Sequence, residues 1–294
     1  MDTNLRRTIL WTLVAAYTFV LPDAIIVYDT IAKHFTVPVA RKVPIVITLF
    51  FGLSYIVFGL ITQKNVGYHL FILPCVFIVL AVVFLEPNPN KHIHMPEYMV
   101  MAWLLYEAFS VDYRGSGIFL LVFLCASMLG IVDELAQGIY PGRYYGWIDM
   151  GINSASSIIG VFILMGLKNR PKTDWAWTNH LLKRNVSLVQ LAFGAMGAVL
   201  LCVYLFDVQA ARVFRGVYPR WLSIWNCAFL TLSPAIVLYD RYRFRGHGSP
   251  GDEKGSAFYA NEVTADLWVV IPLVILFAMH AIAAFAAFSG MPFA

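Results

Sequence analysis

Apolar residues in this chain occur in long continuous blocks separated by short polar segments. Nine blocks can be marked, at residues 8–28, 44–62, 68–85, 96–110, 116–135, 147–167, 186–206, 221–239 and 266–288. A block of about 20 apolar residues, wound as a helix, crosses the ~30 Å hydrocarbon layer of a bilayer. Backbone groups in lipid must satisfy one another, and continuous blocks do not alternate as barrel strands do, so the blocks predict helices. The sequence therefore predicts an all-α, polytopic transmembrane helical bundle with about nine spans.

Composition agrees with this pattern and narrows the function. Hydrophobic residues make up 60% of the 294 residues and charged residues 13%, whereas a soluble domain averages about 25% charged residues. A disordered chain is thereby excluded, and an ordinary soluble enzyme is disfavoured. The formal net charge of +4 is spread over short loops without a basic run, so no nucleic-acid binding is expected. The four cysteines lie in apolar blocks without a CxxC pair, which argues against a disulfide framework or a zinc knuckle.

The loops carry an asymmetry in positive charge that predicts orientation. If the N-terminus is cytoplasmic, thirteen of the 21 Lys and Arg residues fall on the cytoplasmic side, most clearly in the loops at 168–185 and 240–265. The C-terminus of a nine-span chain is then extracytoplasmic. Arg6 and Arg7 resemble a signal-peptide start, but no small-residue cleavage site follows the first block, so we expect a retained span. We expect residues 1–294 to form a single integral domain of the cell membrane.

Two polar segments, residues 86–98 and 133–153, join apolar blocks on the same side of the membrane, which is the outer side in this orientation. Pro96 suits the first turn of a helix, and Pro141-Gly142 predicts a tight turn. Residues three or four apart share one face of a helix. The polar pairs with this spacing are His94 with Glu97 and Tyr98, Asp133 with Gln137, and Asp149 with Asn153. We therefore expect three helix ends to present polar faces to one another near the outer interface.

The second segment also carries a recognisable motif. The pattern D-E-x-x-Q-x-x-x-P-G-R-x-x-x-x-x-D-x-x-x-N runs from Asp133 to Asn153 and is followed by Gly160. It resembles the signature of the VanZ-like family, and K-x-x-H-x-x-x-Y, starting at Lys91, is similar to that family's other motif. The resemblance implies a core at about residues 68–168, with additional flanking spans at 8–62 and 186–288. It also implies an envelope membrane protein of an antibiotic resistance family, associated with the glycopeptide teicoplanin, whose biochemical activity is undefined.

Ionisable residues inside or beside a membrane span are expensive and mark candidate sites. The expected ligand-binding residues are Lys91, His94, Glu97, Tyr98, Asp133, Glu134, Gln137, Arg143, Asp149 and Asn153. Arg143 and Lys91 suit a small anionic ligand, such as a phosphate or carboxylate headgroup or a cell-wall or lipid-linked molecule. In the structural alternative, Arg143 forms ion pairs with Asp133, Glu134 or Asp149 that lock the helix ends together. Membrane lipids and a cell-wall precursor are the expected partners.

Three other functions fit the same residues. His92 and His94 with Glu97 suit a metal ion, with Asp133 or Glu134 completing the ligand set. A hydrogen-bonded interfacial histidine is commoner, so no metal or cofactor is expected. His94 and Glu134 are candidate catalytic residues of an intramembrane hydrolase or transferase that acts on a lipid-linked substrate. The motif holds no Ser or Cys nucleophile, and the serines at 154, 156 and 157 suit helix packing, so we favour a non-enzyme. A proton- or ion-coupled transporter would use the carboxylates with Lys91 as a relay.

Overall fold

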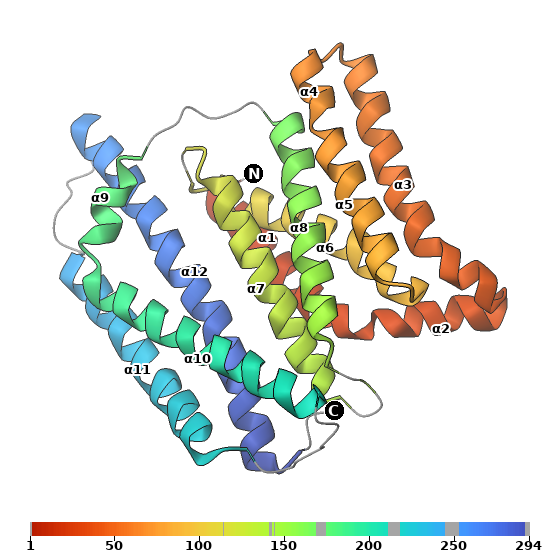
Figure 1. The fold of residues 1–294 in the computed structure, drawn as a ribbon. Coiled ribbons are helices and arrows are strands. Elements are labelled where there is room, and N and C mark those ends of the chain that lie inside the picture. Colours follow the sequence, from red (N-terminus) through yellow and green to blue (C-terminus); the bar gives the residue numbers. More distant parts are fainter. Residues whose placement is uncertain are drawn as a thin grey trace. The chain divides into compact units, whose positions relative to one another are not determined.

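The computed structural model describes residues 2–113, 115–140, 143, 145–168, 175–210, 218–244 and 253–291, and every regular element among them is a helix (Figure 1). The elements are α1 (Thr3–Val20), η1 (Leu21–Asp23), α2 (Ala24–His34), α3 (Val37–Ile61), α4 (Val66–Leu70), α5 (Ile72–Leu85), η2 (Pro89–Ile93), α6 (His94–Ser110), α7 (Ile118–Gly138), α8 (Trp147–Leu167), α9 (Trp177–Leu182), α10 (Asn185–Ala210), α11 (Arg220–Phe244) and α12 (Glu253–Ser289). The predicted all-α fold class is confirmed for this part of the chain.

Seven helices in the described ranges are long and apolar enough to cross a membrane. They are α3, the stretch Val66–Leu85 that joins α4 and α5, α7, α8, α10, Arg220–Asp240 of α11 and Ala260–Ser289 of α12. Many of their large apolar side chains are exposed, for example Phe50, Phe77 and Phe84, as expected for surfaces that face lipid. The chain is therefore a multi-pass membrane protein. The count of about nine spans stays a prediction, because α6 has 17 residues and the first block is broken.

The first apolar block is not one continuous helix. The prediction placed it at residues 8–28, whereas α1 ends at Val20, η1 follows, and the segments Thr3–Asp23 and Ile26–His34 are bent by 54°. Pro22 explains the break, because proline has no N–H for the helix ladder and its ring clashes with the preceding turn.

The helix α3 begins at Val37, earlier than the predicted residue 44. Thr36 caps it by accepting a hydrogen bond from the N–H of Val39, which stabilises a start at Val37.

The chain divides into two compact units, which we describe separately. The first unit comprises Met1–Val111, Ile118–Gly130 and Ile148–Pro171. The second unit comprises Asp112–Gly117, Ile131–Trp147 and Lys172–Ala294. The VanZ-like core expected at residues 68–168 thus contributes to both units, and the single membrane domain stays a prediction.

In the first unit, α3, α5, α6 and α8 pack together around buried apolar side chains. Cys75, Met99 and Ile159 are buried there, with Phe51 and Phe162 packed against them. A Cβ at Gly160 would lie 2.8 Å from Cβ of Ala102 and 3.1 Å from Cα of Met99, so only glycine permits this approach of α6 to α8. Close packing through small residues is the main source of attraction between helices in lipid.

In the second unit, α10, α11 and α12 form a bundle with glycines on the inner face of α10. A Cβ at Gly194 would lie 2.2 Å from the ring of Phe229, and one at Gly197 would lie 2.3 Å from Nε1 of Trp225. The short helix α9 packs on α12, where the rings of Trp177 and Trp268 stack with centroids 5.1 Å apart. Large rings therefore fill the space that the α10 glycines leave.

Candidate functional site

The polar segment between α5 and α6 is shaped by its own side chains. Oε1 of Glu86 accepts a hydrogen bond from the N–H of Asn88 at 2.9 Å, and Oδ1 of Asn88 accepts one from the N–H of Asn90 at 3.1 Å. His92 donates through Nε2 to the backbone carbonyl of Glu86 at 2.9 Å. Such bonds from side chains to nearby backbone groups stabilise turns. They hold residues 86–93 in a tight loop and fix where Lys91 and the start of α6 lie.

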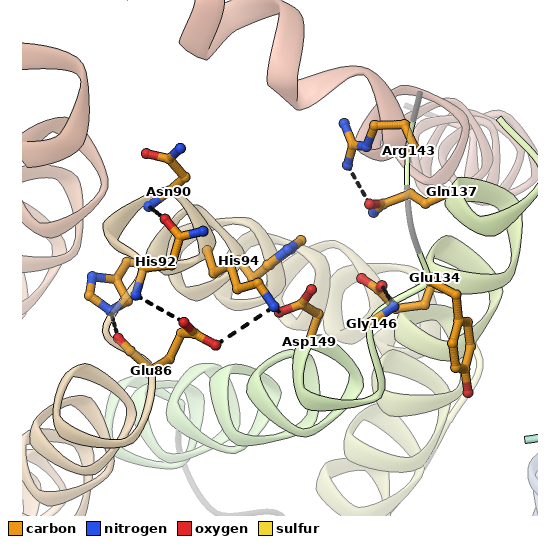
Figure 2. Close-up of polar contacts among 12 residues, drawn as sticks. Glu86, Asn90, His92, His94, Glu134, Gln137, Arg143, Gly146 and Asp149 are labelled. Atoms are coloured by element: carbon orange, nitrogen blue, oxygen red, sulfur yellow. Dashed lines mark hydrogen bonds and ion pairs between the residues drawn. The ribbon is translucent and has the colours of Figure 1, made fainter. Parts of the chain in front are cut away.

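Lys91 lies between two carboxylates. Its Nζ is 3.0 Å from Oδ1 of Asp149, at the start of α8, and 3.6 Å from Oε2 of Glu86, at the end of α5. Figure 2 shows the carboxylates of Glu86 and Asp149 directed toward the same point. Glu86 is 6% exposed and Asp149 is 8% exposed. The three side chains carry two potential negative charges and one positive charge, and we call them the acidic cluster.

His94 and Glu97 form the pair that their helical spacing predicts. Nδ1 of His94 lies 3.2 Å from Oε2 of Glu97, and both side chains are almost fully buried. Pro96 lies between them in the first turn of α6, as expected. Tyr17 of α1 donates its hydroxyl to the backbone carbonyl of Glu97 at 3.0 Å, which anchors this turn. The Tyr98 ring is fully buried, with its centroid 6.5 Å from that of His94.

Asn153 has a structural role that the motif alone does not reveal. Its Nδ2 donates to the backbone carbonyl of Gly130 in α7 at 3.4 Å, and the side chain is fully buried. A Cβ at Gly130 would lie 2.8 Å from Cβ of Asn153 and 3.3 Å from the Tyr98 ring. Asn153 and Gly130 therefore bring α8 and α7 into direct contact within the first unit.

In the second unit, the end of α7 binds the segment that follows it. Oε2 of Glu134 accepts a hydrogen bond from the N–H of Gly146 at 3.0 Å, and Arg143 donates to Oε1 of Gln137 (Figure 2). Asp133 and Glu134 are buried, at 1% and 0% exposure. Burial raises the pKa of Tyr145 far above its ordinary value, with smaller contributions from Cys202 and Glu134. These contacts bind Arg143 and Gly146 to the end of α7, and the tight turn predicted at Pro141-Gly142 lies outside the described residues.

The structure thus distributes the predicted site over both units. Lys91, His94, Glu97, Tyr98, Asp149 and Asn153 belong to the first unit, and Asp133, Glu134, Gln137 and Arg143 belong to the second. One shared cluster of all these residues stays a prediction. The described ion pair of Asp149 comes from Lys91, and the described hydrogen bond of Arg143 goes to a neutral amide. Since the His92 ring is bonded to a backbone carbonyl, the two histidines of the H-x-H pair have different roles.

A set of buried polar residues in the second unit was not found from the sequence. Gln190 of α10 donates to Oγ of Ser233 in α11 at 2.8 Å, and Ser187 donates to Asp240. All four side chains are at most 4% exposed. We call these contacts, together with those of His280, the polar ladder. Asn226, Ser233 and Asp240 are seven residues apart along α11, and this heptad spacing inside an apolar helix is the signal that reveals them.

His280 of α12 is fully buried and adds two contacts to the polar ladder. Its Nε2 lies 3.0 Å from the backbone carbonyl of Gly194, and its Nδ1 lies 2.6 Å from the side-chain amide oxygen of Asn226. A carbonyl only accepts, so the proton belongs on Nε2. Nδ1 of the neutral ring then accepts from Asn226 when the amide presents its NH₂ group, because the O and N of an amide are interchangeable in shape. In this form both ring nitrogens of the buried His280 have hydrogen-bond partners, and the ring is neutral.

No family model matches the chain, and neither a curated protein nor a solved structure matches it. The VanZ-like resemblance therefore stays a prediction that rests on the motif residues themselves.

Proposed function

We propose that the chain is an envelope membrane protein whose acidic cluster, Glu86, Lys91 and Asp149, binds a positively charged group of a small envelope molecule. The observation that carries this proposal is the position of Lys91 Nζ between two buried carboxylates, at 3.0 Å and 3.6 Å. The VanZ-like motif suggests the envelope setting. The sequence favoured an anionic ligand bound by Lys91 and Arg143, and the contacts of Lys91 favour the opposite charge.

The electrostatic reason is the charge balance of the cluster. A buried carboxylate is costly unless a cation or a hydrogen-bond donor compensates it. One ammonium group cannot fully compensate two carboxylates, so the cluster gains most from a further proton or cation. An added anion would instead compete with Asp149 and Glu86 for Lys91. A primary ammonium group, with three donors, suits the oxygens of the two carboxylates.

The proposed topology has nine spans, a cytoplasmic N-terminus and the acidic cluster on the outer side. Contacts in the first unit support part of it. NH2 of Arg6, in α1, lies 3.5 Å from Glu107, near the end of α6, and Nζ of Lys168, after α8, lies 2.7 Å from the same carboxylate. The start of α1 thus lies beside the ends of α6 and α8.

Reporter fusions after Asn90 and after Lys172 should report opposite sides, outer and cytoplasmic, and a same-side result would contradict the span count between them.

Thermal unfolding of the purified protein in detergent tests the ligand's charge. Ethanolamine, a primary ammonium probe, should raise the melting temperature in a saturable way, and inorganic phosphate at equal ionic strength should not. Asp149→Asn removes one carboxylate and the excess charge with it, so the apparent affinity for ethanolamine should fall at least tenfold.

The matched control is Asp29→Asn, which changes an exposed carboxylate of the same unit. It should leave the ethanolamine response unchanged. Saturable stabilisation by phosphate that needs Lys91, without any response to ethanolamine, would overturn the proposal and restore the anionic ligand.

Acid–base catalysis is the second candidate, and the contact between His94 and Glu97 favours it. A carboxylate at Nδ1 orients an imidazole and stabilises its protonated form, so that Nε2 can exchange a proton with a substrate. The substrate class would be a lipid-linked envelope molecule. Incubation with radiolabelled polyprenyl phosphate lipids should give a product with the unaltered protein and with His34→Gln, which changes an exposed histidine of α2, and none with His94→Gln. Equal turnover by both variants would exclude this role for His94.

A further inference from the structure

An open pocket of about 710 Å³, which we call the cavity, lies in the first unit between α3, α6 and α8. Small-molecule sites in proteins have volumes of roughly 300–1,000 Å³, and their walls are mostly apolar. The apolar lining includes Phe50, Phe58, Met99, Trp103, Leu104 and Ile163. Its polar lining consists of Ser54, Tyr55 and Lys168. The cavity thus combines a long apolar wall with one charged side chain.

The α3 wall of the cavity is held in place by its own contacts. The hydroxyl of Tyr55 donates to the carbonyl of Tyr68 at 2.6 Å, and the hydroxyl of Tyr68 donates to the carbonyl of Tyr55 at 2.7 Å. Their rings stack with centroids 4.2 Å apart. A Cβ at Gly166 would lie 1.9 Å from the Tyr55 hydroxyl, so glycine is needed for this approach to α8. A wall fixed in this way loses little conformational entropy when a ligand binds.

The charged end of the cavity has the opposite charge balance to the acidic cluster. Lys168 lies 2.7 Å from Oε1 of Glu107, and Arg6 lies 3.5 Å from Oε2 of the same carboxylate. Two cations therefore share one carboxylate. Nζ of Lys168 also lies 5.7 Å from the centroid of the Trp103 ring and 5.2 Å from that of Tyr106. These rings position the ammonium group at the cavity while its side chain stays 34% exposed.

We propose that this cavity binds the hydrocarbon chain of an anionic amphiphile, whose phosphate or carboxylate group contacts Lys168. The apolar wall accommodates the chain, and the ammonium group, with three donors, binds the headgroup while it keeps its contact with Glu107. The excess positive charge at Arg6 and Lys168 selects an anionic headgroup over a zwitterionic one. The site is distinct from the acidic cluster, because Lys168 follows the end of α8 whereas Asp149 lies in its first turn.

Photo-crosslinking of the full-length protein in nanodiscs tests the proposal. The probes are a photoreactive fatty acid, a photoreactive phosphatidic acid and a photoreactive phosphatidylcholine with the same chain. At least one anionic probe should label the cavity-lining segments 50–58 and 99–104 at least tenfold more than the choline probe, as mapped by mass spectrometry. Competition with unlabelled fatty acid or phosphatidic acid distinguishes a carboxylate headgroup from a phosphate.

Two substitutions separate headgroup binding from chain binding. Lys168→Met should reduce anionic labelling to the level of the choline probe, whereas Lys64→Met, a lysine of the same unit outside the cavity, should not. Ser54→Trp should fill the cavity and reduce labelling by every probe, whereas Leu53→Trp, on the exposed face of α3, should not. If Lys168→Met does not fold, labelling of Ser54→Trp and the competition with unlabelled fatty acid or phosphatidic acid still test the proposal. Equal labelling by anionic and choline probes, or labelling unaffected by Ser54→Trp, would overturn the proposal.

Discussion

The two units of this protein stabilise polar residues inside a membrane in different ways. The first unit concentrates charged side chains at helix ends and in the loop before α6, where Lys91 and Lys168 each bind carboxylates. The second unit also has an ion pair near a helix end, between Arg184 and Asp266, but its bundle adds uncharged contacts inside α10, α11 and α12, where Gln190 bonds to Ser233 and His280 bonds to the Gly194 carbonyl. Ion pairs at the ends of helices can reach water, whereas groups in the middle must satisfy one another.

The difference indicates which polar groups are available for chemistry. The acidic cluster has one carboxylate more than it has cations, and the Arg6–Glu107–Lys168 group has one cation more, so each can gain from a ligand of the opposite charge. In the polar ladder, Gln190 and Ser233 supply a donor and an acceptor to each other, so this contact has no charge to offer. We therefore propose ligand binding for these two charged groups of the first unit, and helix adhesion for the contact between Gln190 and Ser233.

The largest effect is expected from Lys91→Met. This change leaves Glu86 and Asp149 buried without their shared ammonium group, and breaking a buried ion pair costs about 3–5 kcal/mol. The free energy of unfolding, measured by steric trapping in detergent, should fall by an amount in the lower part of this range, because Lys91 is 30% exposed.

The triple variant Lys91→Met, Glu86→Gln, Asp149→Asn provides the control, since it removes all three charges together. It should recover most of the lost stability. A loss below about 0.5 kcal/mol for Lys91→Met, the size of an exposed ion pair, would show that the cluster is solvated and that the comparison is wrong.

A smaller effect is expected from Gly194→Val in the polar ladder. The new Cβ would lie 2.2 Å from the buried ring of Phe229, and overpacking of this kind costs about 1–3 kcal/mol. Gly52→Val is the matched control in α3, because a Cβ there would meet nothing within 4 Å. Thermal unfolding should show a lower melting temperature for Gly194→Val only. Equal melting temperatures would mean that α10 and α11 separate easily and that the ladder does not hold them.

The hydrogen bond between Gln190 and Ser233 should contribute less still. Hydrogen bonds between membrane helices average about 0.6 kcal/mol in double-mutant cycles. The cycle Gln190→Leu, Ser233→Ala and the double variant should give a coupling energy of about that size in the free energy of unfolding. A coupling above about 2 kcal/mol would place the ladder in the same energetic class as the acidic cluster.

The smallest effect concerns His180 in α9, outside the membrane-spanning segments. Burial lowers its pKa below the ordinary 6.5, Lys183 and Arg184 lower it further, and Glu262 opposes them. The unfolded chain therefore binds a proton at His180 more readily than the folded chain does. The contribution of neutral His180 to the free energy of unfolding is complete above pH 6.5 and is lost as the pH falls below 6.5. His180→Gln should slightly reduce the fall in melting temperature between pH 7.5 and pH 5.5. A larger fall in the variant would show that folding raises the pKa of His180 instead of lowering it.

The sequence by itself determined the helical membrane class, because a continuous apolar block admits one way to satisfy its backbone in lipid. It also determined local pairs. His94 and Glu97 meet because they are three residues apart on one helix. Asp149 and Asn153, four residues apart, likewise share one face of α8 near its start. The block boundaries were accurate at 147–167. They failed at Pro22, where the missing N–H ends α1, and at α3, which begins at Val37 because Thr36 caps it.

Only the tertiary structure decided which charges meet. Lys91 is separated from Asp149 by two helices, and nothing in their spacing indicates that they form an ion pair. The cavity at Lys168 likewise depends on how α3 approaches α8 at Gly166, a contact between distant parts of the chain. Helical periodicity fixes neighbours within a few residues. Contacts between helices depend on the sum of many small packing terms, which a single sequence does not display.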